Sequence, residues 1–385
     1  MIRFHWRLLE GGEAARSFTD VTRHDSTKGL PDLEAQTRFC RDAEDVGIDS
    51  LLVNVNYAQP DPMVLAMALA RRTESITFMV ATRPGLMSPT LFAQQVNTFS
   101  SLSGGRISLN VVAGHTPKEL AGYGDDLDHD ARYARMDEFL EICQLLWAAD
   151  GPVDFDGTYY TIRDGRINTP FVSSGRRGPE VFVGGNSASC REVAARRASC
   201  WLRFPLPPTE LARELRPVLD AGKEVGLRMS VIARPTREEA LAVAHRLVAA
   251  GEDAKADDER AFVQTSDSQS VRAVFALAEQ EWLTPHLWTG AVRRYGAPCV
   301  ALVGSYDEVA EQLYHFGEIG IGHFILMGWP KWDEMVRFGR EVIPRTRALE
   351  AAGLMRAATA RAIPPPLAAR AGEAPPAPSP LADEG

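Results

Sequence analysis

The chain has 385 residues, of which 45% are hydrophobic and 24% are charged, the balance of an ordinary globular protein. Its 42 lysine and arginine residues face 51 aspartate and glutamate residues, which gives a formal net charge of −9. This argues against a nucleic acid as partner, because binding to phosphate backbones needs a basic face. The length is compatible with a single large α/β domain.

Targeting and redox signals are absent from the sequence. The five cysteines are scattered and form no CxxC pair, which argues against a disulfide framework or a zinc site. The first residues lack the long apolar segment of a signal peptide, and no stretch approaches the roughly 18 apolar residues of a membrane span. We therefore expect a cytoplasmic protein with reduced thiols and no membrane partner.

Short apolar segments alternate with amphipathic helical segments along the chain. Apolar segments without polar alternation are typical of strands that are buried on both faces. The sequence predicts eight such strands, over Ile2–Leu8, Ser50–Val55, Ile76–Thr82, Ile107–Val112, Val181–Val183, Trp201–Phe204, Met229–Ala233 and Phe324–Met327. Helices are expected between them, for example over Leu33–Val46, Met63–Arg72, Thr90–Leu102, Met136–Trp147, Pro208–Val225, Arg237–Ala250 and Tyr306–Ile319.

Alternation of strand and helix at this spacing indicates βαβ units and a parallel sheet. Eight units close most simply into a (β/α)₈ barrel of the TIM type, which is the predicted α/β fold. A doubly wound open sheet is the alternative. That fold favours a GxGxxG turn after its first strand, and none follows Ile2–Leu8.

Two insertions interrupt the repeat. The first, at about 153–170, contains a predicted β-hairpin over Asp154–Ile167 with its turn at Asp164-Gly165. The second is a long excursion over Glu252–Val300 with a charged start and an aromatic second half. Insertions beside strand ends often form lids, so we expect the second to cover the site.

The last residues are rich in alanine and proline, with the runs PPP and PPAPSP. Such a composition cannot bury a core, which predicts a disordered tail. The expected organisation is one barrel domain over 1–355, with the two insertions, followed by the tail over 356–385.

Functional residues of a barrel lie at the carboxyl ends of its strands. Here these ends are rich in amide, hydroxyl and aromatic side chains and poor in carboxylates. Paired acids of a glycosidase, metal-binding clusters and a GxSxG elbow are all missing. This pattern indicates a site for a large polar cofactor, which would bring the difficult chemistry itself.

The segment VFVGGNSASC is the clearest candidate for an anion site. A predicted strand ends in Gly184 and Gly185, and Asn186 and Ser187 stand where a helix begins. Backbone N–H groups and the helix dipole would face a phosphate there. A tight turn with a serine N-cap is the alternative. The pair Arg132-Tyr133 would add a charge and a hydroxyl, or else be a surface arginine and a core-edge tyrosine.

Two longer segments carry a resemblance to a known family. Residues 81–139 follow the pattern SPT…A.Q..T…LS.GR…N.V.G…EL.G…LDH..RY, and residues 179–187 read PEVFVGGNS. Both are similar to the alkanesulfonate monooxygenase branch of the bacterial luciferase-like flavin-dependent monooxygenases. LWTGAVRRYGAPCVALVGS, at 287–305, extends the resemblance to the second insertion.

The resemblance implies an enzyme with FMN at the barrel mouth. The family takes FMNH₂ from a separate NAD(P)H:flavin reductase and adds O₂, and the resulting flavin peroxide attacks a small-molecule substrate. On the family pattern, Asn110, Ala113 and Gly114 lie along the flavin, and Thr82 lies near its ring edge. The remaining cofactor-binding residues implied are Asn54, Tyr133, Gly184, Gly185, Asn186 and Ser187.

The residues expected to face the substrate depart from the family pattern. Ser230 stands where the sulfonate enzymes have a histidine, and Trp329 and Lys331 replace a tyrosine and a histidine. Gln59 and Phe204 replace a cysteine and a tryptophan, whereas Arg228 is retained. The family's loop arginine aligns with Arg294 or with Tyr295. The candidate catalytic residues are therefore Arg228, Ser230, His115, Trp329, Lys331 and Arg294.

In this interpretation Arg228, with Arg294 or Lys331, anchors an anionic group, and His115 donates to the flavin or is a capped loop residue. A shared cofactor with a different substrate follows, compatible with specialised metabolism. An F420-dependent oxidoreductase and a non-catalytic flavin-binding barrel are the alternatives. Relatives of this kind are usually homodimers or homotetramers.

Overall fold

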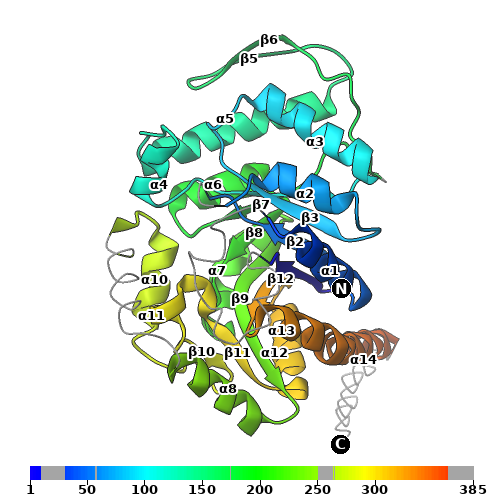
Figure 1. The fold of residues 1–385 in the computed structure, drawn as a ribbon, viewed down its shortest axis with the longest axis vertical. Helices are drawn as coiled ribbons and strands as arrows, with labels where there is room; N and C mark the ends of the chain where they lie inside the picture. The colour runs from blue at the N-terminus through cyan, green and yellow to red at the C-terminus, as the bar shows by residue number, and fades with distance from the viewer. Residues whose placement is uncertain (10–30, 57–58, 174, 250–262, 264, 363–385) are drawn as a thin grey trace, which may run out of the picture.

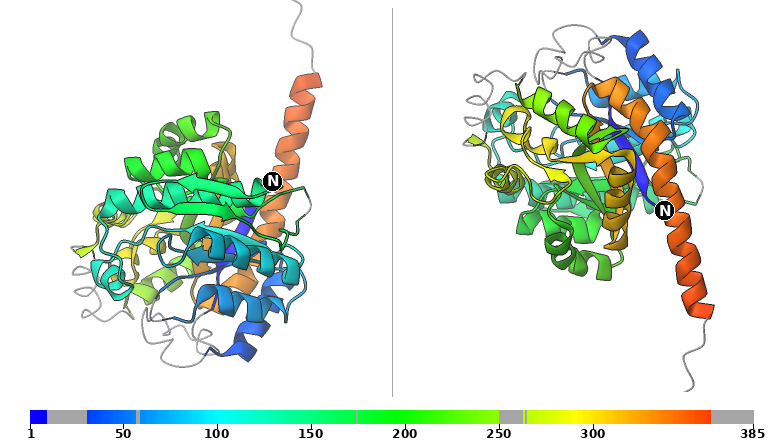
Figure 2. Two further views of the ribbon diagram at one scale, coloured as in Figure 1. Left: turned by 90° about the horizontal axis from the view of Figure 1, so that it is seen from above. Right: turned by 90° about the horizontal axis from the view of Figure 1, so that it is seen from below.

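The computed structural model describes residues 1–9, 31–56, 59–173, 175–249, 263 and 265–362. Eight parallel strands form its centre and helices surround them (Figures 1 and 2). The strands are β1 Arg3–Arg7, β2 Ser50–Val53, β3 Thr77–Thr82, β4 Ile107–Val111, β7 Glu180–Gly184, β8 Cys200–Arg203, β9 Glu224–Arg234 and β12 Ile321–Gly328. Each overlaps one of the eight predicted strands.

The sheet closes into a barrel through β9. The order runs β12-β1-β2-β3-β4-β7-β8, and β9 pairs in parallel with both β8 and β12. The predicted (β/α)₈ barrel is thereby confirmed, and the open sheet is excluded because an open sheet has two unpaired edges.

The outer helices begin where the sequence provides capping side chains. Ser88 caps α3 and Asp128 caps α5, and each side chain accepts a hydrogen bond from a backbone N–H of the first turn. Ser305 and Glu308 form a capping box at the start of α12. The helices around the barrel are α1 Leu33–Asp45, α2 Pro62–Ala70, α3 Pro89–Ser103, α4 Pro117–Gly122, α5 His129–Ala148, α6 Ala188–Arg197, α7 Pro208–Asp220, α12 Tyr306–Glu318, α13 Lys331–Arg337 and α14 Ile343–Ala362.

Alternate residues of each strand point into the barrel and form layers. At the amino-terminal end, His5 Nε2 lies 2.9 Å from His323 Nδ1, and His323 Nε2 lies 3.1 Å from a Glu224 carboxylate oxygen. Burial lowers the pKa of both histidines. An apolar layer comes next, made by Leu52, Met79, Ala81, Phe182, Cys200, Leu202 and Ile325. The layer above it opens at the carboxyl ends of the strands.

The connection between β9 and β12, which contains the second insertion, adds elements beyond the eight-strand barrel. Between β9 and β12 lie α8 Arg237–Ala249, α10 Gln269–Leu277, β10 Leu287–Trp288, α11 Val292–Tyr295, a short 3₁₀ turn at Ala297–Cys299 and β11 Ala301–Ser305. β11 pairs in parallel with the second half of β9 and was not among the predicted strands. β9 extends beyond the end of β8, so the later residues of β9 do not pair with β8. β11 pairs with these residues instead.

The first insertion forms a hairpin, as predicted, but its turn lies elsewhere. Strands β5 Val153–Asp156 and β6 Thr161–Gly165 pair antiparallel, so the turn is at 157–160 and not at Asp164-Gly165. The Glu138 carboxylate of α5 accepts three backbone N–H groups of this turn and holds it in place. Asp164 adopts a φ of 49°, and the strand register shifts near it. The Asp164-Gly165 pair therefore lies where the pairing of β5 with β6 changes register, and not at the hairpin turn.

The chain end also differs from expectation. Helix α14 continues to Ala362, past residue 356 where the tail was expected to begin, and alanine and arginine in this stretch favour a helix. The rest of the expected tail lies outside the described residues. All five cysteines are buried and free. Within the described ranges, none of the helices has the length and apolar character to cross a membrane.

Candidate active site

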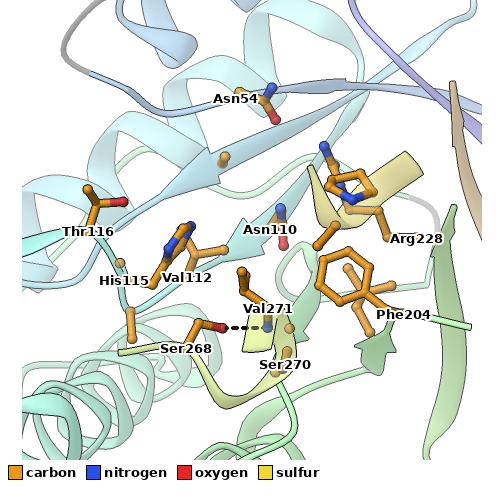
Figure 3. A pocket seen from close by; sticks show the side chains of 18 of the residues that line it. Asn54, Asn110, Val112, His115, Thr116, Phe204, Arg228, Ser268, Ser270 and Val271 are labelled. Carbon is orange, nitrogen blue, oxygen red and sulfur yellow. Dashed lines mark hydrogen bonds between the residues drawn. The ribbon is translucent and has the colours of Figure 1, made fainter. Parts of the chain in front are cut away.

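A cavity of about 380 Å³ lies at the carboxyl ends of the barrel strands (Figure 3). Its volume is in the range of sites for small molecules and cofactors. Residues at or just after the ends of all eight barrel strands form its walls, together with the second insertion. This is the face on which barrel enzymes carry their active sites.

The cavity gathers most of the residues that the sequence singled out. Eleven predicted site residues line it: Asn54, Asn110, Ala113, Gly114, His115, Tyr133, Gly184, Gly185, Asn186, Ser187 and Arg228. Gln59 and Phe204, noted above as departures from the family pattern, line it as well. Residues from six separate segments therefore converge on one space.

The turn from β7 into α6 has the geometry of an anion site. Ser187 is the N-cap of α6, and its hydroxyl accepts a hydrogen bond from the backbone N–H of Cys190. Trp201 Nε1 donates to the Gly185 carbonyl at 2.8 Å, and Arg203 Nε donates to Asn186 Oδ1 at 3.3 Å. These two hydrogen bonds fix the turn, whose residues line the cavity. The dipole of α6 adds positive potential there.

Tyr133 brings a hydroxyl to the same turn from α5. A methyl group built at Gly185 would lie 2.9 Å from Tyr133 Oη and 2.8 Å from Cys190 Sγ. Burial raises the pKa of the Tyr133 hydroxyl well above its usual value, so the group is protonated at neutral pH and remains a donor. The imidazole of His129 packs 5.0 Å from the Tyr133 ring and also lines the cavity.

Arg132 does not accompany Tyr133 into the cavity. Its buried guanidinium donates to the carbonyls of Ala113 and Leu127 and forms an ion pair with Asp267. Arg132 therefore ties the loop after β4 to the second insertion. The hypothesis that it helps to hold a phosphate is not supported by this arrangement.

Thr82 is buried and lies outside the cavity lining, whereas its neighbour Arg83 lines the cavity. Arg83 shares the inward face of β3 with Ala81, and Thr82 points the other way. Arg83 Nη2 pairs with Glu119 Oε2 at 2.9 Å, and both side chains are buried. Within the described chain, Arg83 Nε and Nη1, Glu119 Oε1 and the nearby Asn110 Oδ1 have no hydrogen-bond partner.

Four of the six candidate catalytic residues lie outside the cavity lining. Ser230 is completely buried, and its hydroxyl donates to the Pro298 carbonyl at 2.8 Å. It follows Arg228 on the inward face of β9, but the 3₁₀ turn over Ala297–Cys299 covers it. Trp329 is buried in a second apolar cluster that includes Trp288 and Met327, with the Tyr295 ring 6.3 Å away.

The other two lie on short helices. Lys331 is the first residue of α13 and lies outside the lining. Arg294, on α11, donates from Nη1 to the Val248 carbonyl of α8. Its neighbour Tyr295 lines the cavity, so the ungapped alignment of the loop position agrees better with the structure. Only Arg228 and His115 of the candidate catalytic residues border the cavity.

The second insertion closes one side of the cavity, as expected of a lid. Residues Asp267 to Val271, with Tyr295, Ala297 and Pro298, contribute to its wall. His115 Nδ1 lies 3.1 Å from Ser266 Oγ, and the His115 carbonyl accepts the Asp267 N–H. Part of the predicted lid, at 252–262 and 264, lies outside the described residues.

Five charged residues of the lining were given no site role from the sequence: Arg7, Arg83, Glu119, Arg203 and Asp267. A signal existed for the first two. Strand residues two apart share a face, so Arg7 follows the inward His5, and Arg83 follows the inward Ala81. Glu119 lies on α4, and its direction depends on tertiary packing that no local pattern shows.

Comparison with known proteins places these features in a wider group. The family model described as luciferase-like monooxygenase matches residues 15–323. An EDTA monooxygenase from Chelativorans sp. BNC1 superposes with a TM-score of 0.73 and 21% identity, over 91% of this chain and 94% of the other. A long-chain alkane monooxygenase gives 0.67 and 20%, over 91% and 92%. An F420-dependent secondary alcohol dehydrogenase gives 0.61 and 18%, over 90% and 99%.

Proposed function

Since the chain belongs to the luciferase-like monooxygenase family, we propose that it is an FMN-dependent monooxygenase that oxidises a small organic substrate with O₂. Reduced FMN would come from a separate NAD(P)H:flavin reductase. The observation that carries the proposal is the cavity itself, in which a glycine-rich helix N-terminus and several strand-end amides line one space.

The residues present fit FMN. A phosphate needs several donors, and the Gly185–Ser187 backbone, the Ser187 hydroxyl and the protonated Tyr133 hydroxyl supply them without a buried carboxylate beside them. A methyl group at Gly184 would meet nothing closer than 3.7 Å, so this turn leaves space on its cavity side. On the neighbouring strand β4, Asn110 Oδ1 lacks a partner among the described residues, and so do two nitrogens of Arg83 at the end of β3. Buried polar atoms of this kind call for a polar ligand or water.

Bound reduced FMN would supply the two electrons with which O₂ gives one oxygen atom to the substrate and the other to water. The chain's own residues would orient the flavin and exclude bulk water. Ala113 and Gly114 border the site where the ribityl chain and ring would lie, and His115 joins that loop to the second insertion. A closed, dry site prevents the loss of reducing equivalents to solvent.

The substrate is not expected to be a simple alkanesulfonate. Ser230, Trp329 and Lys331, which differ from the sulfonate enzymes, also lie outside the cavity lining. We propose instead that Phe204, Tyr295 and Arg228, which all line the cavity, face the substrate.

The test compares cofactors directly. The purified chain is titrated anaerobically with reduced FMN and with reduced F420, and O₂ uptake is then followed with a flavin reductase and NADH present. We expect micromolar or tighter binding of reduced FMN and weaker binding of F420. Preference for F420 would indicate an F420-dependent oxidoreductase. FMN binding with no substrate-dependent O₂ uptake across a broad panel of organic compounds would favour a flavin-binding barrel without catalysis.

A further inference from the structure

The end of strand β8 supports the turn between β7 and α6. The pairing of the two strands continues one step into this turn, where the Gly185 N–H donates to the Leu202 carbonyl at 3.2 Å. The residues on either side of Leu202, Trp201 and Arg203, share the opposite face of β8. Trp201 Nε1 donates to the Gly185 carbonyl at 2.8 Å, and the Arg203 guanidinium lies 4.9 Å from the centre of the Trp201 ring. Arg203 is therefore close to the turn that we assign to the FMN phosphate.

Arg203 connects an exposed acid to the lining of the cavity. Its buried guanidinium forms an ion pair with Glu214 of α7, whose side chain is 47% exposed. A second nitrogen, Nε, donates to Asn186 Oδ1 at 3.3 Å, and both Arg203 and Asn186 line the cavity. Water screens the exposed carboxylate more strongly than it screens the buried guanidinium. The pair therefore contributes a positive potential to the cavity.

The hydrogen bond from Arg203 decides how the Asn186 amide is turned. A guanidinium only donates hydrogen bonds, so the amide atom beside it must be the oxygen. The NH₂ group of the amide is then at the other end, and it has no acceptor among the described residues. A phosphate offers acceptor oxygens. An Asn186 side chain held in this way can donate to a phosphate, whereas the reversed amide would present its oxygen and repel one.

We propose that Arg203 is a positioning residue of the phosphate site, which fixes the Asn186 amide with its NH₂ group available to the FMN phosphate. The enzyme thereby prefers FMN to a flavin without a phosphate. This inference rests on the proposed function, from which the FMN phosphate is taken. It goes beyond the Gly184–Ser187 pattern, because Arg203 lies on a different strand and acts on the cofactor through Asn186.

The experiment measures flavin selectivity, which is the ratio of the dissociation constants of reduced riboflavin and reduced FMN, by anaerobic calorimetry of the full chain at pH 7.5. Arg203→Met keeps the length and the apolar contacts of the side chain but cannot donate. It is expected to lower the ratio about tenfold, the value of one charge-assisted hydrogen bond, and to change riboflavin binding less than about twofold. Arg203→Lys should retain part of the ratio. A merely structural role would weaken binding of both flavins alike and leave the ratio unchanged.

Two further variants test whether Arg203 acts through Asn186. Asn186→Asp keeps an oxygen beside Arg203 but replaces the NH₂ group by a second carboxylate oxygen, so it should lower the ratio at least as much as Arg203→Met. In an Asn186→Ala background, Arg203→Met should change the ratio by less than about twofold, because the group through which it acts is gone. The matched control is Arg216→Met, since Arg216 is an exposed arginine on α7, and its ratio should equal that of the wild type.

Three results would each overturn the inference. They are wild-type selectivity in Arg203→Met or in Asn186→Asp, equal binding of the two flavins by the wild type, and an effect of Arg203→Met that is undiminished in the Asn186→Ala background. Because Asn186→Asp retains the ion pair of Arg203 with Glu214, it provides the test even where Arg203→Met does not fold. A wild type that binds neither reduced flavin would instead contradict the proposed function.

Discussion

Neighbouring glycines at the turn after β7 should respond very differently to the same added methyl group. Gly185 has a φ of 145°, and its Cβ would lie 2.8 Å from Cys190 Sγ and 2.9 Å from Tyr133 Oη. Gly184 has no positive φ, and its Cβ would meet only Leu202, at 3.7 Å. The pair therefore separates the backbone requirement from a general effect of substitution in this turn.

The magnitude for Gly185→Ala has two parts. An unfavourable backbone region costs on the order of 1–3 kcal/mol. Overpacking against two buried side chains costs about 1–3 kcal/mol more. The sum, on the order of 2–6 kcal/mol, is a large part of the roughly 5–15 kcal/mol by which a domain is stable. A displaced turn would also move the N–H groups that we assign to the FMN phosphate.

Urea denaturation and FMN titration measure the two consequences. Gly185→Ala should lower the midpoint of unfolding clearly and weaken FMN binding by more than about tenfold, equivalent to 1.4 kcal/mol. Gly184→Ala should unfold near the wild-type midpoint. A Gly185→Ala protein with wild-type midpoint and FMN affinity, or a Gly184→Ala protein that is the less stable of the two, would refute the reasoning.

Three further predictions follow from the described contacts. Asp267→Ala should destabilise the protein by about 3–5 kcal/mol, because it leaves a buried guanidinium without its charge partner, and urea unfolding would detect it; an unchanged midpoint contradicts this. Tyr133→Phe should weaken binding of FMN but not of riboflavin, since only FMN carries the phosphate, and equal losses in the two titrations would count against the assignment. Burial lowers the pKa of His5 and His323, so their contribution to stability is present above the unfolded value near 6.5 and falls as pH drops below it. The urea midpoint should therefore be lower at pH 5.5 than at pH 7.5, and replacement of His5 by Gln should reduce the difference, whereas replacement of the exposed His315 should not.

The barrel was predictable because its strands are marked locally. Each consists of consecutive apolar residues bounded by polar or glycine-containing turns, and helical segments separate them. The Gly184–Ser187 turn was predictable for the same reason, since two glycines and an N-cap serine at a strand end have few other structural uses. Both features depend on residues that are close together in the sequence.

The features that were missed depend on tertiary contacts. The extra strand β11 pairs with the part of β9 that extends beyond the end of β8. The relative lengths of β8 and β9 cannot be read from the local sequence of β11. The hairpin turn is set by Glu138, a residue of α5 some twenty positions earlier. The same limit explains Ser230, which is hidden by the 3₁₀ turn that follows Gly296 nearly seventy residues later.

The clearest contrast is between Arg7 and Arg294. The family resemblance directed attention to the loop position of Arg294, whose guanidinium turns to the Val248 carbonyl. Arg7 was passed over because its segment, Ile2–Leu8, was read as a buried apolar strand. Alternation along that strand does separate its two faces. Phe4 and Trp6 pack outward against the helices, whereas His5 and Arg7 point into the barrel.

The central claim is that this cavity holds reduced FMN with its phosphate at the turn between β7 and α6. The most direct test is anaerobic calorimetry of the wild-type chain with reduced FMN and with reduced riboflavin, which lacks the phosphate. Our account predicts one FMN site per chain and binding at least about tenfold tighter than that of riboflavin, the value of one charge-assisted phosphate contact. Equal affinities, or no binding of reduced FMN, would contradict it.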